Sequence, residues 1–148
     1  MPTADDRPSV LAVLDASVAV RWVVSERGSE DAARLLGEPV GWLAPRLMLT
    51  EAAGALRKKV SGGELDASHA AQAIDFLVDG ALGGLIHLAD DEMLVAKALL
   101  LAITLKHAVP DCLYLALAEQ EGAALATADA RLASLAQSRG VEVWKVTA

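Results

Sequence analysis

Cysteine is nearly absent from this sequence. Cys112 is the single cysteine in 148 residues, so no disulfide can form within the chain. A lone cysteine is typical of proteins that stay in a reducing compartment. The first eight residues contain neither the basic head nor the apolar core of an export signal. We therefore expect a cytoplasmic protein in which residues 1–8 form a loose N-terminus.

Long apolar runs and an excess of positive charge are also lacking. The longest stretch without Asp, Glu, Lys or Arg runs from Gly80 to Ala89, whereas a membrane-spanning helix needs roughly 18 residues. We therefore expect no membrane span and no membrane partner. The 13 basic residues are outnumbered by 20 acidic ones, giving a formal net charge of −7. This balance excludes a general basic coat for nucleic acid. Either nucleic acid is not the partner, or the acids gather where a metal ion reverses their sign.

Aromatic residues make up only 3% of the chain, while hydrophobic residues make up 54%. Most of the apolar content is Ala, Leu and Val, which suits helices packed on a small sheet. This content excludes disorder except at the ends, because apolar burial can offset chain entropy. The length is that of one ordinary domain, so we expect a single domain over residues 1–148.

Short apolar runs alternate with segments of helical periodicity along the chain. The runs predict strands at residues 10–14, 40–44, 85–88, 123–127 and 141–146. The periodic segments predict helices at residues 18–24, 28–36, 46–60, 66–78, 90–107, 112–120 and 129–138, of which 90–107 is the longest. This alternation predicts an α/β fold with a small, mainly parallel central sheet, flanked by helices and joined by right-handed crossovers.

Four acidic residues lie where such a fold binds ligands. In an open parallel sheet, ligands collect at the carboxyl ends of the strands. Asp15 directly follows the first strand, and Asp129 follows the fourth strand with one residue between. Asp111 opens a helix, and Glu51 lies on a helix face. Taken singly, the aspartates are explained as helix caps and Glu51 as a solvated side chain. Only convergence of the four would indicate a site.

Carboxylates gathered in one place would need a cation. Two of them about 4 Å apart repel by roughly 4 kcal/mol at an effective dielectric near 20. A hard divalent ion removes this repulsion, and Mg²⁺ or Mn²⁺ suits a set of ligands without His or Cys. Such an ion can activate water and hold a phosphodiester. Ser17 and Thr127 each lie two residues from an acid, where a hydroxyl could orient a carboxylate or serve as an ordinary cap.

The acidic segments resemble a known family. VLDASVAVRW (13–22), LTEAAGALRK (49–58), VPDCLYLALAE (109–119) and LATADARL (125–132) occur in this order. Together they resemble the four acidic blocks of a PIN domain, most closely the VapC ribonuclease toxins of bacterial toxin–antitoxin pairs. The resemblance covers nearly the whole chain and implies a three-layer α/β/α domain. It assigns Asp15, Glu51, Asp111 and Asp129 to the catalytic, metal-binding acids of the family.

The resemblance also implies an activity and partners. These are metal-dependent cleavage of RNA, a homodimer, and a cognate VapB-type antitoxin that blocks the site. We expect Asp15 and Asp129 to anchor the principal Mg²⁺ (or Mn²⁺), with Asp111 as a direct or water-mediated ligand. Two residues depart from the family pattern: Cys112 replaces a common Ala, and Pro110 replaces a frequent larger residue. The alternatives are a different phosphate-handling α/β domain, or a non-catalytic binding partner that keeps the fold.

Few basic residues lie near the four acids. Arg57 and Lys58 are one to two turns beyond Glu51 on the same expected helix, and Arg131 is two residues after Asp129. These three are candidates for contacts with RNA phosphates, with solvated surface charge as the alternative. The histidines have no regular ligand spacing, so we expect structural or solvated roles for His69, His87 and His107.

Overall fold

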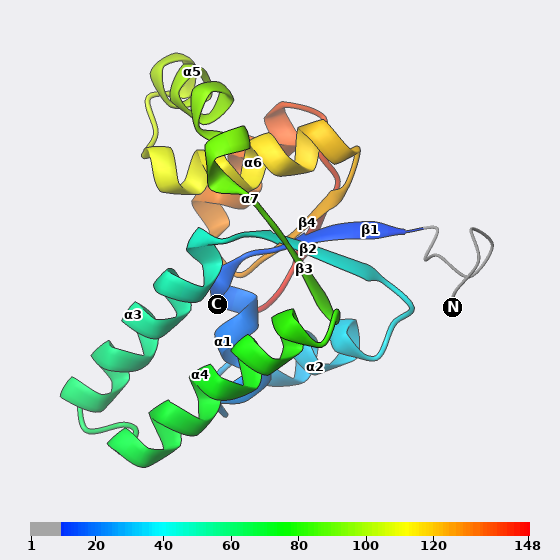
Figure 1. Ribbon diagram of the computed structural model, residues 1–148. Coiled ribbons are helices and arrows are strands. Elements are labelled where there is room, and N and C mark those ends of the chain that lie inside the picture. The colour runs from blue at the N-terminus through cyan, green and yellow to red at the C-terminus, as the bar shows by residue number, and fades with distance from the viewer. Residues whose placement is uncertain (1–9) are drawn as a thin grey trace.

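The computed structural model describes residues 10–148, so the loose N-terminus expected for residues 1–8 lies outside the described residues. Strands and helices alternate along these residues (Figure 1). The strands are β1 (Leu11–Leu14), β2 (Gly41–Pro45), β3 (Ile86–Ala89), β4 (Ala124–Thr127) and β5 (Val143–Lys145). The helices are α1 (Ala16–Val23), α2 (Ser29–Leu36), α3 (Leu47–Ser61), α4 (Ala67–Leu82), α5 (Val95–Leu105), α6 (Val109–Glu121) and α7 (Ala130–Ser138), with a 3₁₀ turn, η2 (Asp91–Met93).

Among the described residues, the sheet has five strands in the order β3-β2-β1-β4-β5, and all four strand pairs are parallel. The chain moves outward from β1 through β2 to β3, and then returns to place β4 on the other side of β1. The strand order therefore reverses between β1 and β4, which is where open parallel sheets bind ligands. Asp15 and Asp129 follow these two strands.

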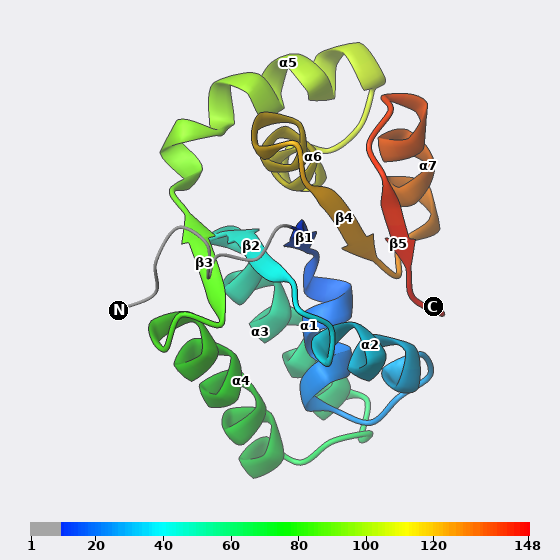
Figure 2. The same cartoon turned by 90° about the vertical axis from the view of Figure 1, so that its right-hand side faces the viewer.

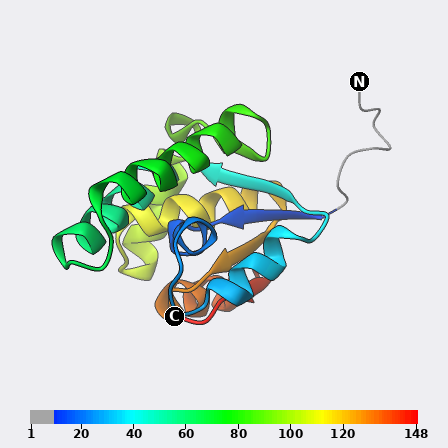
Figure 3. The same ribbon diagram turned by 90° about the horizontal axis from the view of Figure 1, so that it is seen from below.

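Helices cover both faces of the sheet, as the three-layer prediction requires. Helices α1 to α4 lie on one face, and α5 to α7 lie on the other (Figures 2 and 3). The central strand β1 is buried on both faces, with Ala12, Val13 and Leu14 fully inaccessible, as its unbroken apolar run predicts. Helix α6 packs against β1, β2 and β4, which explains why most of its side chains are buried.

The segment after β3 differs from the prediction of one long helix over residues 90–107. It forms η2 and the shorter α5, and α4, with 16 residues, is the longest helix. The acids at the start of this segment pair with another part of the chain. Asp90 accepts a hydrogen bond from Arg46 at 2.9 Å, and Asp91 accepts one from the backbone N–H of Leu47 at 3.1 Å. Asp91 therefore binds a free amide at the start of α3 instead of capping its own helix.

The three tryptophans of the chain meet at the edge of the core. Trp42 is buried, and its ring contacts Trp22 and Trp144 edge-on, with centroids 5.0 and 6.1 Å away. The indole N–H of Trp22 donates to the carbonyl of Ala32 at 2.8 Å. The tryptophans therefore join α1, α2, β2 and β5.

Helix α5 presents aliphatic side chains to solvent. Val95, Leu99, Leu100 and Ile103 are between 49% and 66% exposed. Within residues 10–148, no single helix is long and apolar enough to cross a membrane. Helices α5 and α6 have the required length and apolar character only when they are taken together, and they are bent by 113° relative to each other.

Candidate active site

Asp15 occupies the position of a helix cap without acting as one. It precedes α1 in an extended conformation, yet its carboxylate accepts no hydrogen bond from the amides of that helix. Instead its Oδ2 accepts hydrogen bonds from Ser17 Oγ at 2.5 Å and Thr127 Oγ1 at 2.7 Å. Oδ1 receives no hydrogen bond from any residue in the described part of the chain. The side chain is held rigidly by one oxygen, and the other is left available.

The two hydroxyls also connect Asp15 with Asp129. Ser17 Oγ accepts a hydrogen bond from the Ala128 N–H at 3.0 Å, and Thr127 Oγ1 accepts one from the Asp129 N–H at 3.0 Å. The backbone of Asp15 joins the same network, because its N–H donates to the Ala126 carbonyl at 3.1 Å. The ends of β1 and β4 are thus tied together, and Ser17 and Thr127 lie where they can orient the first acid.

Asp129 is a true cap of α7. Its Oδ1 accepts hydrogen bonds from the backbone N–H groups of Arg131 and Leu132, at 2.9 and 3.2 Å. Among the described residues, no donor reaches Oδ2. Capping therefore explains one oxygen of Asp129 and leaves the other for a ligand.

The remaining two acids have side-chain donors. Asp111 lies in the first turn of α6, and its Oδ2 is 2.6 Å from His107 Nε2. Glu51 projects from α3, and its Oε1 accepts a hydrogen bond from the buried Tyr114 hydroxyl at 2.5 Å. The side chain of His107 is only 5% exposed and contacts Asp111, so of the two roles expected for this histidine, structural or solvated, the solvated one does not apply.

All four acids line one hollow of about 510 Å³ at the carboxyl edge of the sheet. Of the basic residues proposed for RNA, Lys58 lines this hollow, whereas Arg57 and Arg131 are exposed outside it. Two basic residues that were not predicted, Arg21 and Lys59, also line it, together with Glu26 and Glu64. The hollow is therefore lined by both acidic and basic side chains.

Burial and the charges of neighbouring acids raise the pKa values of two acids in this hollow, Asp15 and Glu51. Burial is the largest cause for Asp15, whose pKa is raised further by the charges of Asp111 and Asp129, against the opposing effect of its two hydroxyl donors. Burial also raises the pKa of Glu51, as do the nearby charges of Asp15 and Asp111. Burial and these carboxylates keep the pKa of Tyr114 far above its ordinary value, so its hydroxyl stays a donor. The hollow therefore disfavours the negative charges of Asp15 and Glu51.

The donor set fits a hard divalent cation. Each of the four acids contributes one carboxylate oxygen that accepts no hydrogen bond from the described residues. These oxygens lie around a partly desolvated hollow. Within residues 10–148, no three His, Cys, Asp or Glu side chains lie close enough together to ligate one ion directly. Mg²⁺ usually retains several water ligands and needs only one or two carboxylates, so this spacing is compatible with it.

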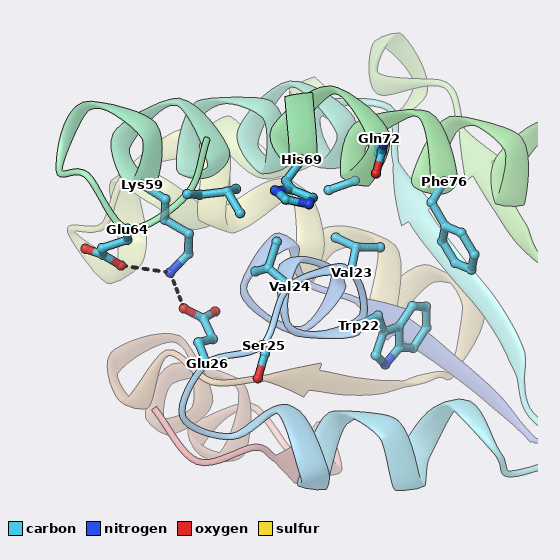
Figure 4. A pocket seen from close by; sticks show the side chains of 12 residues that line it. Trp22, Val23, Val24, Ser25, Glu26, Lys59, Glu64, His69, Gln72 and Phe76 are labelled. Carbon is cyan, nitrogen blue, oxygen red and sulfur yellow. Dashed lines mark hydrogen bonds and ion pairs between the residues drawn. The ribbon is translucent and has the colours of Figure 1, made fainter. Parts of the chain in front are cut away.

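A second hollow, of about 580 Å³ (Figure 4), shares part of its lining with the acidic one. Its wall is largely apolar and includes Trp22 and Phe76 from α1 and α4. Glu26, Lys59 and Glu64 line both hollows, and Lys59 forms ion pairs with both glutamates. An apolar groove therefore leads to the acidic site past a cluster of charged side chains.

The fold and the hollow together define an α/β/α protein with a site of carboxylates between β1 and β4, where the strand order of the parallel sheet reverses. The family model of the PIN domain matches residues 12–137, and the chain therefore belongs to the PIN domain family. PIN domains are generally nucleases. The resemblance drawn from the acidic segments is confirmed at the level of the family.

Solved structures share this fold. PAE2754 from Pyrobaculum aerophilum is 18% identical, with a TM-score of 0.69 over 93% of this chain and 91% of that one. VapBC2 from Rickettsia felis, solved with a DNA fragment from its promoter, is 11% identical, with a TM-score of 0.62 over 93% and 99%. FitAcB from Neisseria gonorrhoeae is 17% identical, with a TM-score of 0.56 over 90% and 96%. At these identities the likeness concerns the fold. A comparison with curated proteins found no match.

Proposed function

We propose that this protein is a metal-dependent endoribonuclease that hydrolyses RNA phosphodiester bonds as the toxin of a type II toxin–antitoxin pair. The observation that carries the proposal is the gathering of Asp15, Glu51, Asp111 and Asp129 around one hollow. Membership of a family of nucleases supports the chemistry. Structures of a VapBC complex and of FitAcB with the same fold support the toxin–antitoxin setting.

Asp15 and Asp129 would hold the principal Mg²⁺ or Mn²⁺, with Asp111 as a direct or water-mediated ligand. Each of these acids has one oxygen already fixed by a donor of the protein, which limits the rearrangement that binding requires. When bound, such an ion neutralises phosphate charge and makes water a better nucleophile. Ser17 and Thr127 hold the Asp15 carboxylate in place for this role.

Glu51 would complete the ligand shell of the ion or accept the proton of the attacking water. Its raised pKa brings it closer to the range of a useful general base, and the Tyr114 hydroxyl fixes one of its oxygens. Water oxygen bonds to phosphorus, the bond from phosphorus to the 3′ oxygen breaks, and that oxygen takes up a proton. The expected products carry a 5′-phosphate and a 3′-hydroxyl.

The wall of the hollow supplies the contacts proposed for RNA. Lys58 lies closest to this role because it lines the hollow, and Arg57 and Arg131 would contact phosphates further along a bound strand. Lys59 and Arg21 form ion pairs with Glu26. Because these pairs partly neutralise their charge, they would attract RNA phosphates less than Lys58 does. Charge repulsion keeps RNA away from the acids unless metal is bound.

A VapB-type antitoxin is the partner that the adjoining groove suits. The apolar wall around Trp22 and Phe76 would accept an apolar segment of the antitoxin (Figure 4). A basic side chain following that segment would enter the acidic hollow and neutralise it in place of metal. Because the two hollows share residues, one peptide can fill both and block the substrate.

A homodimer is supported by the aliphatic face of α5. Leu99, Leu100 and Ile103 are at least half exposed on a helix in which Lys97 is the only charged residue. A chain with a formal charge of −7 can approach a second copy most closely through such an uncharged face. Size-exclusion chromatography with light scattering should show a dimer, and Leu100→Lys should shift it to monomer.

The experiment that tests the proposed activity is the mapping of RNA cleavage in cells on induced expression. Wild type should produce new 5′-phosphate ends at defined sites, and Asp15→Asn should produce none at equal expression. Co-expression of a neighbouring small reading frame that encodes the antitoxin should suppress the cuts. Equal cleavage by the wild type and Asp15→Asn, or no cleavage by either protein, would refute the proposal.

A further inference from the structure

We infer that His107 is a positioning residue for Asp111, and that its Nε2–H fixes the Asp111 carboxylate for a divalent cation; this rests on the proposed metal-dependent function. The two atoms that meet, His107 Nε2 and Asp111 Oδ2, are 2.6 Å apart. An ionised carboxylate only accepts hydrogen bonds, so the imidazole is the donor. A contact this short to a charged acceptor is among the stronger hydrogen bonds in proteins.

Asp111 needs such a donor because its helix does not fix it. It lies in the first turn of α6, where a carboxylate can turn back to accept amide hydrogens, but it makes no capping bond. The other three acids are each fixed by hydroxyl or backbone donors. Within residues 10–148, His107 is the single donor to Asp111. Without it, no hydrogen bond from the described residues would fix the orientation of this carboxylate.

The loop between α5 and α6 is shaped to place this imidazole. Lys106 adopts a left-handed conformation, φ 54°, and is the only non-glycine residue among residues 10–148 with positive φ. This turn ends α5 and lets the His107 N–H donate to the Ala102 carbonyl at 3.1 Å. The His107 side chain is then 5% exposed, with its ring against Asp111. The backbone adopts an unfavourable conformation at the residue that sets the direction of the donor.

Two substitutions separate a positioning role from a packing role. His107→Gln keeps an N–H donor three bonds from Cβ, as in histidine, whereas His107→Leu keeps bulk and removes the donor. His107→Asn, whose amide is one bond shorter, is a second loss variant if the leucine protein fails to fold. His87→Leu, on the exposed side of β3, is the matched histidine control.

The test is titration of the purified full chain with Mn²⁺, followed by electron paramagnetic resonance. We expect the Kd for Mn²⁺ to rise about 10- to 100-fold in His107→Leu and His107→Asn, and to stay near the wild-type value in His107→Gln and His87→Leu. In RNA cleavage, the leucine variant should lose activity at low Mg²⁺ and regain the wild-type kcat at high Mg²⁺, which structural damage would not allow.

The outcomes distinguish failure of this inference from failure of the proposed function. If the wild type binds Mn²⁺ and folded His107→Leu and His107→Asn bind it equally well, the positioning role is overturned and the proposed nuclease stands. Loss of affinity in His107→Gln as large as in His107→Leu would also overturn it, because the donor would then not be the cause. If the wild type itself binds no Mn²⁺, the proposed metal site fails and this inference fails with it.

Discussion

In the absence of metal, Asp15→Asn should become more stable than the wild type as the pH rises. Asn keeps the shape of the side chain, and its carbonyl oxygen can still accept from Ser17 and Thr127. What it removes is a buried negative charge close to Asp111 and Asp129. The variant therefore isolates the cost of holding that charge without a cation.

The sign and size of the effect follow from the pKa of Asp15. Burial, together with the neighbouring acids, raises this pKa in the folded protein above the ordinary value of 3.8. Between 3.8 and the raised value, the folded state binds more protons than the unfolded state, so the free energy of unfolding falls as pH rises. The fall is at most about 1.4 kcal/mol per pH unit for one proton. Above the raised pKa the penalty is complete and constant.

The other shifted acids can be separated from Asp15. The pKa of Glu51 is raised too, so Asp15→Asn should keep a residual slope that Asp15→Asn with Glu51→Gln removes. The pKa values of Asp31 and Asp66 are lowered by their hydrogen bonds, and their contributions change only below about pH 4, near and below the ordinary pKa.

Urea unfolding of both proteins in EDTA, from pH 4 to pH 8, measures the effect. Near pH 4 the protonated Asp15 and the Asn make similar neutral hydrogen bonds, so the two proteins should be about equally stable. At higher pH the difference should grow in favour of Asp15→Asn and then level off. Two conflicting results would refute the assignment of a buried carboxylate, repelled by Asp111 and Asp129, at the end of β1. One is a free energy of unfolding that changes with pH equally in both proteins, and the other is a wild type that gains stability relative to the variant.

Three further predictions concern the metal and two backbone positions. Mn²⁺ at 100 times its Kd should raise the stability of the wild type by about 2.7 kcal/mol, or roughly 5–10 °C in Tm, and should leave Asp15→Asn unchanged; an equal shift in both would place the ion elsewhere. Gly28→Ala should lower the free energy of unfolding in urea by roughly 2–4 kcal/mol, because Gly28 has φ 88° and an added Cβ would lie 2.0 Å from the Thr147 carbonyl oxygen; a loss below 1 kcal/mol would contradict this. Lys106→Gly should raise Tm by a few degrees, since glycine adopts positive φ without strain, and a lower Tm would show that the lysine side chain matters.

The fold was largely accessible from local patterns. Unbroken apolar runs predict buried parallel strands, and all five strands form near the predicted positions. The error at residues 90–107 has a non-local cause, because Asp90 and Asp91 bind Arg46 and Leu47, 44 residues earlier in the chain. Periodicity describes how a segment can bury one face; it contains no information about a distant amide that competes for its first residues.

The residues of the candidate site likewise fall into those that local patterns predict and those that they do not. The positions of Asp15 and Asp129 follow from strand ends, which meet at one edge of any parallel sheet. Lys58 lies seven residues after Glu51, close to two helical turns, so both face the hollow, while Arg57 is rotated away. The bond between Tyr114 and Glu51 joins residues 63 apart, and no local pattern indicates it. His107 is four residues before Asp111, a spacing that was a usable signal, but it lies outside the helix that Asp111 was expected to open.

The central claim is that four acids distant in sequence form one cation site, and a crystal structure with Mn²⁺ tests it most directly. The account predicts an anomalous scattering peak in the hollow lined by Asp15, Glu51, Asp111 and Asp129, with a carboxylate oxygen of Asp15 or Asp129 at a ligand distance of about 2 Å. No peak there at saturating Mn²⁺, or a peak only at another acidic cluster, would contradict it.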